Sequence, residues 1–167
     1  MAEALLISRK DIVRYTSLNG SVDVDKYIQF IYLAQNIHLE NYCGTDLLNK
    51  IKADIIGGTL TGNYETLVKT YLKPMLIHWA MVEYLPFASV VIGNTGLFRH
   101  NSENATNLTQ DEIEKLVKKE QKIAQYYTER FINYMNYNQT LFPEYSTNTN
   151  DDTYPDTDIR DLTNWYI

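Results

Sequence analysis

The side chains best suited to chemistry in this chain are three histidines, His38, His78 and His100, and a single cysteine, Cys43. Histidine binds metal ions and transfers protons near neutral pH, and a cysteine thiolate is a nucleophile. His78 and Glu83 share a predicted helix without the spacing of the zinc-protease motif, and the other histidines have no cysteine or carboxylate at metal-ligand spacing. We therefore expect no metal site, and we expect Cys43 to be a small core residue at a helix end.

Three other patterns that could indicate catalysis are missing or misplaced. Gly-Asn-Thr-Gly at 93–96 has neither a predicted strand before it nor a predicted helix directly after it, and a phosphate-binding loop needs both. No Gly-x-Ser-x-Gly elbow for a nucleophilic serine occurs. The carboxylate pairs Asp23/Asp25 and Asp151/Asp152 lie at a predicted helix start and in a polar tail, where capping and solubility explain them better than acid–base catalysis. The sequence predicts no catalytic residue and no cofactor, and so a protein that is not an enzyme.

The composition indicates one ordinary globular domain with appendages. The 167 residues carry a net charge of −6 and are 44% hydrophobic, and no run approaches the ~18 apolar residues of a membrane span. Nucleic-acid binding needs clustered cations, but the one dense basic cluster is interleaved with glutamates at helical spacing, which favours a solvated face. Its members are Lys115, Lys118, Lys119 and Lys122, with Glu112, Glu114 and Glu120. The sole cysteine and the lack of a signal-peptide pattern favour synthesis in a reducing cytoplasm.

The elements that position these residues are predicted to be helices. The expected fold class is all-α, a small bundle of about five helices with a long C-terminal helix and an extended arm. The first helix is predicted over 9–16 because Ser8 and Asp11 form a capping-box pattern. Ile7 and Ile12 are placed around that box as a hydrophobic staple, which fixes the direction in which the chain enters the helix.

A second helix is predicted over 23–42, ending at Gly44. Its apolar residues cover more than one face, so it should be buried between elements or lie against a neighbouring subunit. A third helix is predicted over 46–55, and it stops at Gly57 and Gly58.

A further helical stretch begins at Gly62 or Asn63, and Pro74 either opens its continuation or kinks it. Pro86 should bend or end the very apolar segment that follows. The connection over 93–109 is long and polar, and loops of this length are uncommon unless they contact something. Its candidate interaction residues, around a short extended segment, are Gly96, Leu97, Phe98 and Arg99.

The clearest helix is predicted over 110–138, opened by a capping box of Thr109 and Glu112. Its apolar residues follow the 3,4 spacing of one helical stripe. At roughly 40 Å it is longer than a compact core of this size needs, so one end should project or pack across a neighbour. Phe142 and Pro143 are expected to end the helical region.

The last 24 residues, 144–167, differ from the body, 1–143. Six carboxylates and one arginine give this tail five of the six net negative charges, and it is too polar to build a core of its own. We expect an extended acidic arm that docks on a neighbouring subunit through aromatic anchors, and whose removal leaves the helices folded. The alternative is that it folds back on its own domain or is disordered. The expected docking residues are Tyr154, Pro155, Trp165, Tyr166 and Ile167.

Five segments, in this order, resemble head–tail adaptor (neck ring) proteins of tailed bacteriophages, in particular those of crAss-like phages. They are Leu-Ile-Ser-Arg-Lys-Asp-Ile at 6–12, Tyr-Leu-Lys-Pro-Met-Leu-Ile-His-Trp-Ala at 71–80, Asn-Thr-Gly-Leu-Phe-Arg-His-Asn-Ser-Glu at 94–103, Ala-Gln-Tyr-Tyr-Thr-Glu-Arg-Phe at 124–131 and Leu-Phe-Pro-Glu-Tyr at 141–145. The resemblance covers the chain from about Leu5 onward, and it lies in the order of the segments rather than in one motif.

The resemblance implies a helical structural protein of the virion, made in the host cytoplasm and located at the neck, with no catalytic residues. Such adaptors form a ring, commonly twelve-fold, beneath the portal protein, and they continue the DNA channel. The implied partners are other copies of the chain, the portal protein and further neck or tail ring proteins, with DNA passing through without sequence-specific binding and with no membrane. The final helix and the loop 93–109 would meet portal or tail neighbours, and the arm would reach along an adjacent ring component.

Two other functions stay open at this point. A head-closure or tail-completion protein shares the position and size of an adaptor, and sequence barely separates the two. A helical DNA-binding regulatory protein is the second, with the helices at 9–16 and 23–42 imitating a helix-turn-helix. The missing basic stripe counts against that second function.

Overall fold

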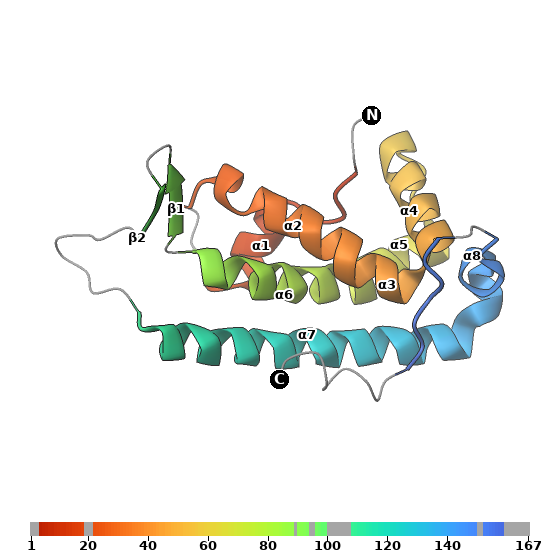
Figure 1. Ribbon diagram of the computed structural model, residues 1–167. Coiled ribbons are helices and arrows are strands. Elements are labelled where there is room, and N and C mark those ends of the chain that lie inside the picture. The colour runs from red at the N-terminus through yellow and green to blue at the C-terminus, as the bar shows by residue number, and fades with distance from the viewer. Residues whose placement is uncertain are drawn as a thin grey trace.

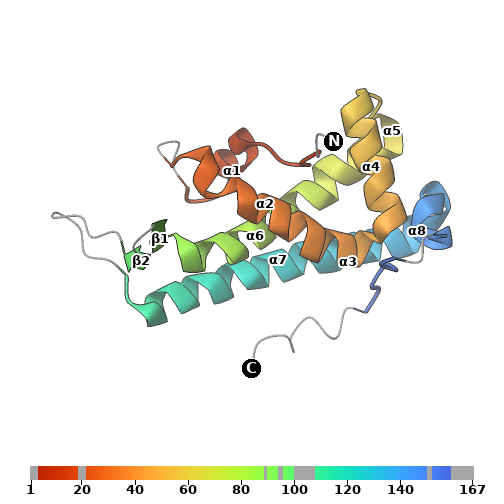
Figure 2. The ribbon, with the colours of Figure 1, turned by 45° about the horizontal axis from the view of Figure 1, so that its top comes forward.

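The computed structural model describes residues 4–18, 22–88, 90–93, 96–99, 108–149 and 152–158, with only the backbone described at 91–93 and 96–99. The fold is all-α, which confirms the predicted class. Helix α6 (Lys73–Tyr84) is the middle layer, between α2 (Ile28–Ala34) and the long α7 (Gln110–Asn138) (Figure 1). Helices α4 (Thr45–Gly57) and α5 (Gly62–Leu67) lie across one end of this stack (Figure 2).

The first helix, α1 (Arg9–Tyr15), begins as the sequence predicts. The backbone N–H and the hydroxyl of Ser8 both donate to the Asp11 carboxylate, at 2.8 and 2.9 Å, as part of the capping box. Ile7 and Ile12 are both buried, so the chain enters the helix from the core side.

The predicted second helix is continuous from α2 to α3 (Glu40–Cys43), with a π-helical turn, Gln35–Leu39, between them. Before it, Val24–Lys26 form a 3₁₀ turn rather than the start of the α-helix. Gly44 ends the run at φ +75°, a conformation in which other residues are strained. Helix α4 then ends at Gly58, which has the left-handed conformation typical of a helix stop.

A second π-helical turn, Val68–Leu72, joins α5 to α6, so that this helical stretch is also continuous. Pro74 lies in the first turn of α6, and its missing N–H coincides with the wide turn before it. Pro86 lies in the 3₁₀ turn Leu85–Phe87 that ends the segment, as predicted.

Helix α6 is buried nearly all round because it has neighbours on both sides. A helix without a polar face needs such a middle position, since any exposed side would leave apolar surface in water. Its buried residues are Met75, Leu76, Ile77, Trp79, Ala80, Met81, Val82 and Tyr84.

A short hairpin follows, β1 (Val90–Gly93) and β2 (Gly96–Arg99), and it is the only sheet in the described part of the chain. The strands pair antiparallel, with Val90 opposite Arg99 and Gly93 opposite Gly96. Helix α7 then spans the predicted residues, 110–138, and its 29 residues measure about 44 Å. Thr109 accepts from the Glu112 N–H, and the Thr109 N–H donates to the Glu112 carboxylate at 2.8 Å, which confirms the capping box.

The expectation that the helical region ends at Phe142 and Pro143 is wrong. Helix α8 (Pro143–Thr147) follows, and Tyr145 is buried in the core with its ring edge-on to Phe131. The tail that was expected to be an extended arm from residue 144 therefore begins with a helix that belongs to the body. Averaging the composition over 24 residues hid this apolar anchor among polar neighbours.

Candidate assembly surfaces

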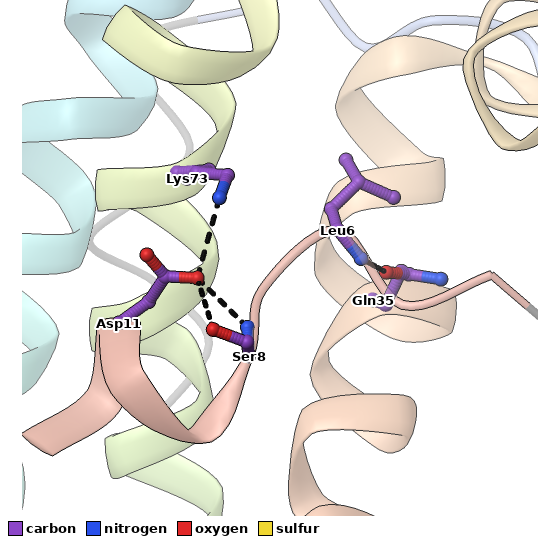
Figure 3. Close-up of polar contacts among 5 residues, drawn as sticks. All are labelled: Leu6, Ser8, Asp11, Gln35 and Lys73. Atoms are coloured by element: carbon purple, nitrogen blue, oxygen red, sulfur yellow. Dashed lines mark hydrogen bonds and ion pairs between the residues drawn. The ribbon is translucent and has the colours of Figure 1, made fainter. Parts of the chain in front are cut away.

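The position of α1 is fixed by the N-terminal segment and by one ion pair (Figure 3). The Leu6 N–H donates to Oε1 of the buried Gln35 at 3.0 Å, and Gln35 Nε2 donates to the Ala4 carbonyl at 2.9 Å. One helical turn after Ser8, the Asp11 carboxylate lies 3.2 Å from the Lys73 ammonium on α6. The segment before α1 is thus tied to the π turn after α2, and α1 itself to α6.

Partial burial alone would raise the pKa of Asp11. The two hydrogen bonds from Ser8 and the charge of Lys73 outweigh that effect, so the pKa of this carboxyl lies below its ordinary value. Asp11 is therefore ionised at neutral pH, and it serves both the helix cap and the contact between α1 and α6.

A groove runs between α1, α6 and α7. It consists of two adjoining hollows of about 450 and 380 Å³, and both are lined by Tyr15 and His78. The rim carries three lysines and two carboxylates, and each carboxylate already has a partner: Asp11 pairs with Lys73, and Glu120 lies 2.7 Å from His78. The further lining residues include Lys69, Pro74, Ile77, Tyr127, Met81, Leu85, Leu116, Lys119 and Ile123.

The two described histidines each join α6 to a neighbouring helical segment. His38, in the π turn, lies 2.8 Å from Glu83 and stacks on the Trp79 ring at 3.9 Å. His78 stacks on Tyr127 at 5.5 Å between ring centres, besides its contact with Glu120. These pairs lie at helix–helix contacts, and in the described part of the chain no group of three or more His, Cys, Asp or Glu side chains could hold a metal ion. His100 lies outside the described residues.

The outer face of the α2 run exposes large apolar side chains. Ile28, Tyr32, Leu33 and Ile37 are between 38 and 52% exposed, while Phe30, Ile31 and Ala34 of the same run are buried. The sequence predicted that this helix is buried between elements or lies against a neighbouring subunit. Within a single chain, only the inner side of the helix is buried, and its outer face stays exposed.

Helix α7 lies on the other side of the stack (Figure 1), and its outer face also exposes aromatic rings. Tyr126 is 61% exposed and Tyr137 90% exposed. Both outer layers of the molecule, α2 above α6 and α7 below it in Figure 1, therefore present apolar or amphipathic side chains to solvent.

Residues 152–158, here called the strap, cross the junction of α3 and α4. The Thr45 N–H donates to the Thr153 carbonyl, and the Thr153 N–H donates to the Thr45 hydroxyl, both at 3.0 Å. The Asp156 N–H donates to the Asn41 carbonyl at 2.8 Å. The buried Asn148 also donates to the Thr153 carbonyl. The strap is thus held through its own backbone groups.

Gly44 accommodates the strap because it has no side chain. A Cβ atom there would lie 2.7 Å from both Cδ and Cγ of Pro155, closer than packed atoms approach. Pro155 is buried at this point, while Tyr154 beside it is 65% exposed. The expectation that Pro155 docks on a neighbouring subunit is therefore wrong for the described chain. Pro155 packs on its own body because the glycine helix stop leaves a space of its shape.

The strap also places a carboxylate near two tyrosines. Burial is the main cause that raises the pKa of Tyr42 to about 12, and the charge of Asp156 adds to it. Burial likewise raises the pKa of Tyr145, with smaller contributions from Cys43 and Asp156. Cys43 is fully buried, and burial first, then Glu40, raises the pKa of its thiol, as expected for a core residue rather than a nucleophile.

The other predicted interaction residues are only partly described. Gly96, Leu97, Phe98 and Arg99 form β2, and Trp165, Tyr166 and Ile167 lie outside the described residues. No described helix combines the length and the hydropathy needed to cross a membrane.

A family model matches residues 39–155, from the π turn to the strap, and its family is described as one of unknown function, DUF6712. The chain belongs to the DUF6712 family. No curated protein and no solved structure matches it.

In this DUF6712 chain, the match ends at Pro155, so it includes α8 and most of the strap. Sequence reasoning missed the partnership of Gly44 and Pro155, because it treated the glycine only as a helix stop. The available signal was a glycine helix stop together with a proline in an otherwise polar tail, but nothing local connects two residues so far apart in the sequence.

Proposed function

We propose that this chain is a structural virion protein that forms a head-to-tail adaptor ring, joining the portal protein to the tail and continuing the DNA channel. The observation that carries the proposal is the exposure of large apolar side chains on both outer helices of a layered body. Ile28, Tyr32, Leu33 and Ile37 lie on the α2 run, and Tyr126 and Tyr137 lie on α7.

A ring subunit needs two different patches that meet head to tail, one on each side. The outer faces of α2 and α7 lie on opposite sides of α6, which suits such a contact (Figures 1 and 2). The occupant of each face is then a neighbouring copy of the chain. Burying the half-exposed rings and aliphatic groups would remove apolar surface from water, at about 25 cal/mol per Å².

The charge distribution supports a conduit for DNA rather than a site that holds it. The body, 1–143, has almost no net charge, and a strongly basic lumen would retain a duplex that has to slide. The outer face of the α2 run presents Ile, Tyr and Leu where a recognition helix would present basic and amide side chains, which counts against a DNA-binding regulatory protein.

The test introduces one carboxylate into each patch, in two separate variants: Ile37→Glu on the α2 run and Tyr126→Glu on α7. Mass measurement over a concentration series and negative-stain electron microscopy would follow association, with the chain alone and co-expressed with the portal protein of the same genome. We expect weak association alone and rings with the portal protein. Each variant should fail to form rings.

An equal mixture of the two variants should give pairs of subunits but no rings, because each variant keeps one intact patch. Ile56→Glu is the matched control, since Ile56 is exposed on α4, away from both patches, and its rings should persist. A tight dimer under all conditions would contradict the ring, as would a loss of association with only one of the two variants.

A further inference from the structure

The groove between α1, α6 and α7 has the chemistry of a receptor for a peptide segment with aromatic anchors. Its floor is apolar, with Ile77, Met81 and Leu85 from α6. Tyr15, 58% exposed, and Tyr127 contribute aromatic rings from α1 and α7. Such a lining buries aromatic side chains well, because rings pack on apolar and aromatic surfaces.

The charges that line the groove are largely paired, so they favour an occupant with little net charge. The lysines are Lys69, Lys73 and Lys119, against the carboxylates Asp11 and Glu120. Asp11 is paired with Lys73 and Glu120 with His78, and Lys69 pairs with Glu65 one turn away. Two of the three lysines, Lys69 and Lys73, therefore already have a carboxylate partner, and the groove suits a segment with few charges of either sign.

The groove also has the length of a short extended segment. Along α6 it runs from Lys73 to Leu85, twelve residues of helix, or about 18 Å. An extended chain advances about 3.3 Å per residue, so five or six residues fill it.

One segment of this chain fits that description. Residues 159–167, outside the described part, read Ile-Arg-Asp-Leu-Thr-Asn-Trp-Tyr-Ile and follow the strap directly. They close on Trp165, Tyr166 and Ile167, and their two charged side chains, Arg160 and Asp161, balance each other. We infer that the groove receives residues 159–167 of a neighbouring copy of the chain. This inference rests on the proposed ring.

The neighbouring copy is favoured over the same copy because strap and groove lie on different sides of α6. With about 3.6 residues per turn, Trp79 and Glu83 project from one side of α6, and Pro74, His78 and Met81 from the other. The first side faces His38 of the run that leads to Gly44 and the strap, and the second lines the groove. A segment that starts at the strap would have to pass around the stack to reach its own groove.

The experiment is disulfide trapping between two full-length variants, each with one added cysteine. Asn164→Cys marks the segment and Lys119→Cys marks the groove, while the native Cys43 is fully buried. Mixed under ring-forming conditions and mildly oxidised, the two variants should give a covalent heterodimer. Lys118→Cys, an exposed neighbour on α7 that does not line the groove, is the matched control and should give none.

Trp165→Ala, added to the Asn164→Cys variant, should abolish the link, because it removes the main anchor. A double variant with both cysteines in one chain tests the same-copy alternative. An internal link in that chain, with no heterodimer in the mixture, would overturn the inference. So would an equal yield from Lys119→Cys and Lys118→Cys.

Electron microscopy of the same samples separates the two proposals. Rings without the heterodimer would leave the adaptor function standing and remove the groove as a receptor. A sample with neither rings nor association would overturn the proposed function itself, together with the inference that rests on it.

Discussion

Gly44 is the residue on which the course of the C-terminal segment depends. It ends α3 at φ +75° and ψ 157°, a region that is essentially restricted to glycine. The space left by its missing Cβ is filled by the Pro155 ring. One residue thus terminates a helix and forms the seat of the strap.

Gly44→Ala should destabilise the protein by about 3 kcal/mol, since it adds backbone strain of 1–3 kcal/mol and a clash with Pro155. Gly58→Ala is the matched control. Gly58 also has a positive φ, but nothing lies within 4 Å of its added Cβ, so the cost should be about 1 kcal/mol. Urea unfolding, with the midpoint and slope compared, measures both.

In a Pro155→Ala background, the losses in free energy of unfolding caused by Gly44→Ala and Gly58→Ala should become more similar. The reason is that Pro155→Ala removes the ring atoms that the new Cβ at position 44 meets. Equal costs for Gly44→Ala and Gly58→Ala in the native background would mean that the strap is not seated at Gly44.

At the scale of elements, α6 holds the layers together through side chains that reach both ways. Trp79 stacks on His38 toward α2 and donates from its indole Nε1 to the Thr128 hydroxyl of α7 at 3.0 Å. Thr128 in turn donates to the Ala124 carbonyl at 2.9 Å. Trp79 and Thr128 are both buried, so water cannot replace the indole's partner.

Thr128→Val should destabilise the protein by about 1–3 kcal/mol, although the shape hardly changes, because the indole N–H is left buried and unpaired. In a Trp79→Phe background, Thr128→Val should leave the free energy of unfolding nearly unchanged, since no indole N–H remains that needs a hydrogen-bond acceptor. Unfolding followed by circular dichroism completes this double-mutant cycle. Additive effects of the two substitutions would show that the hydrogen bond is not what joins α6 to α7.

At the scale of the whole molecule, the described part of the tail completes the body. Helix α8 contributes Tyr145 to the core, and Glu144 accepts from the Tyr64 hydroxyl at 2.6 Å. The strap then packs on Asn41, Gly44 and Thr45. The body therefore includes residues 144–149 and 152–158 of the described chain, beyond the boundary expected at 143.

Two truncations test this boundary. Removal of 159–167 should leave the free energy of unfolding within about 0.5 kcal/mol, as for changes away from packed features. Removal of 144–167 should cost at least about 3 kcal/mol, the usual loss when a buried aromatic side chain is deleted. Thermal unfolding of both, beside the full chain, measures the difference. If the longer truncation melts like the full chain, the whole tail is an independent arm, as its composition alone suggested.

The sequence by itself determined the all-α class, the bounds of α1 and α7, and the helix stops at Gly44 and Gly58. These follow from capping boxes, the 3,4 spacing of apolar residues and the conformational freedom of glycine, all of which act within a few residues of the chain. The tertiary structure alone decided that Pro155 packs on Gly44, that His38 and His78 pair with Glu83 and Glu120, and that α1 bounds a groove. Such contacts join residues from about 40 to 110 positions apart, so they depend on how the helices pack and leave no periodic signal in the sequence.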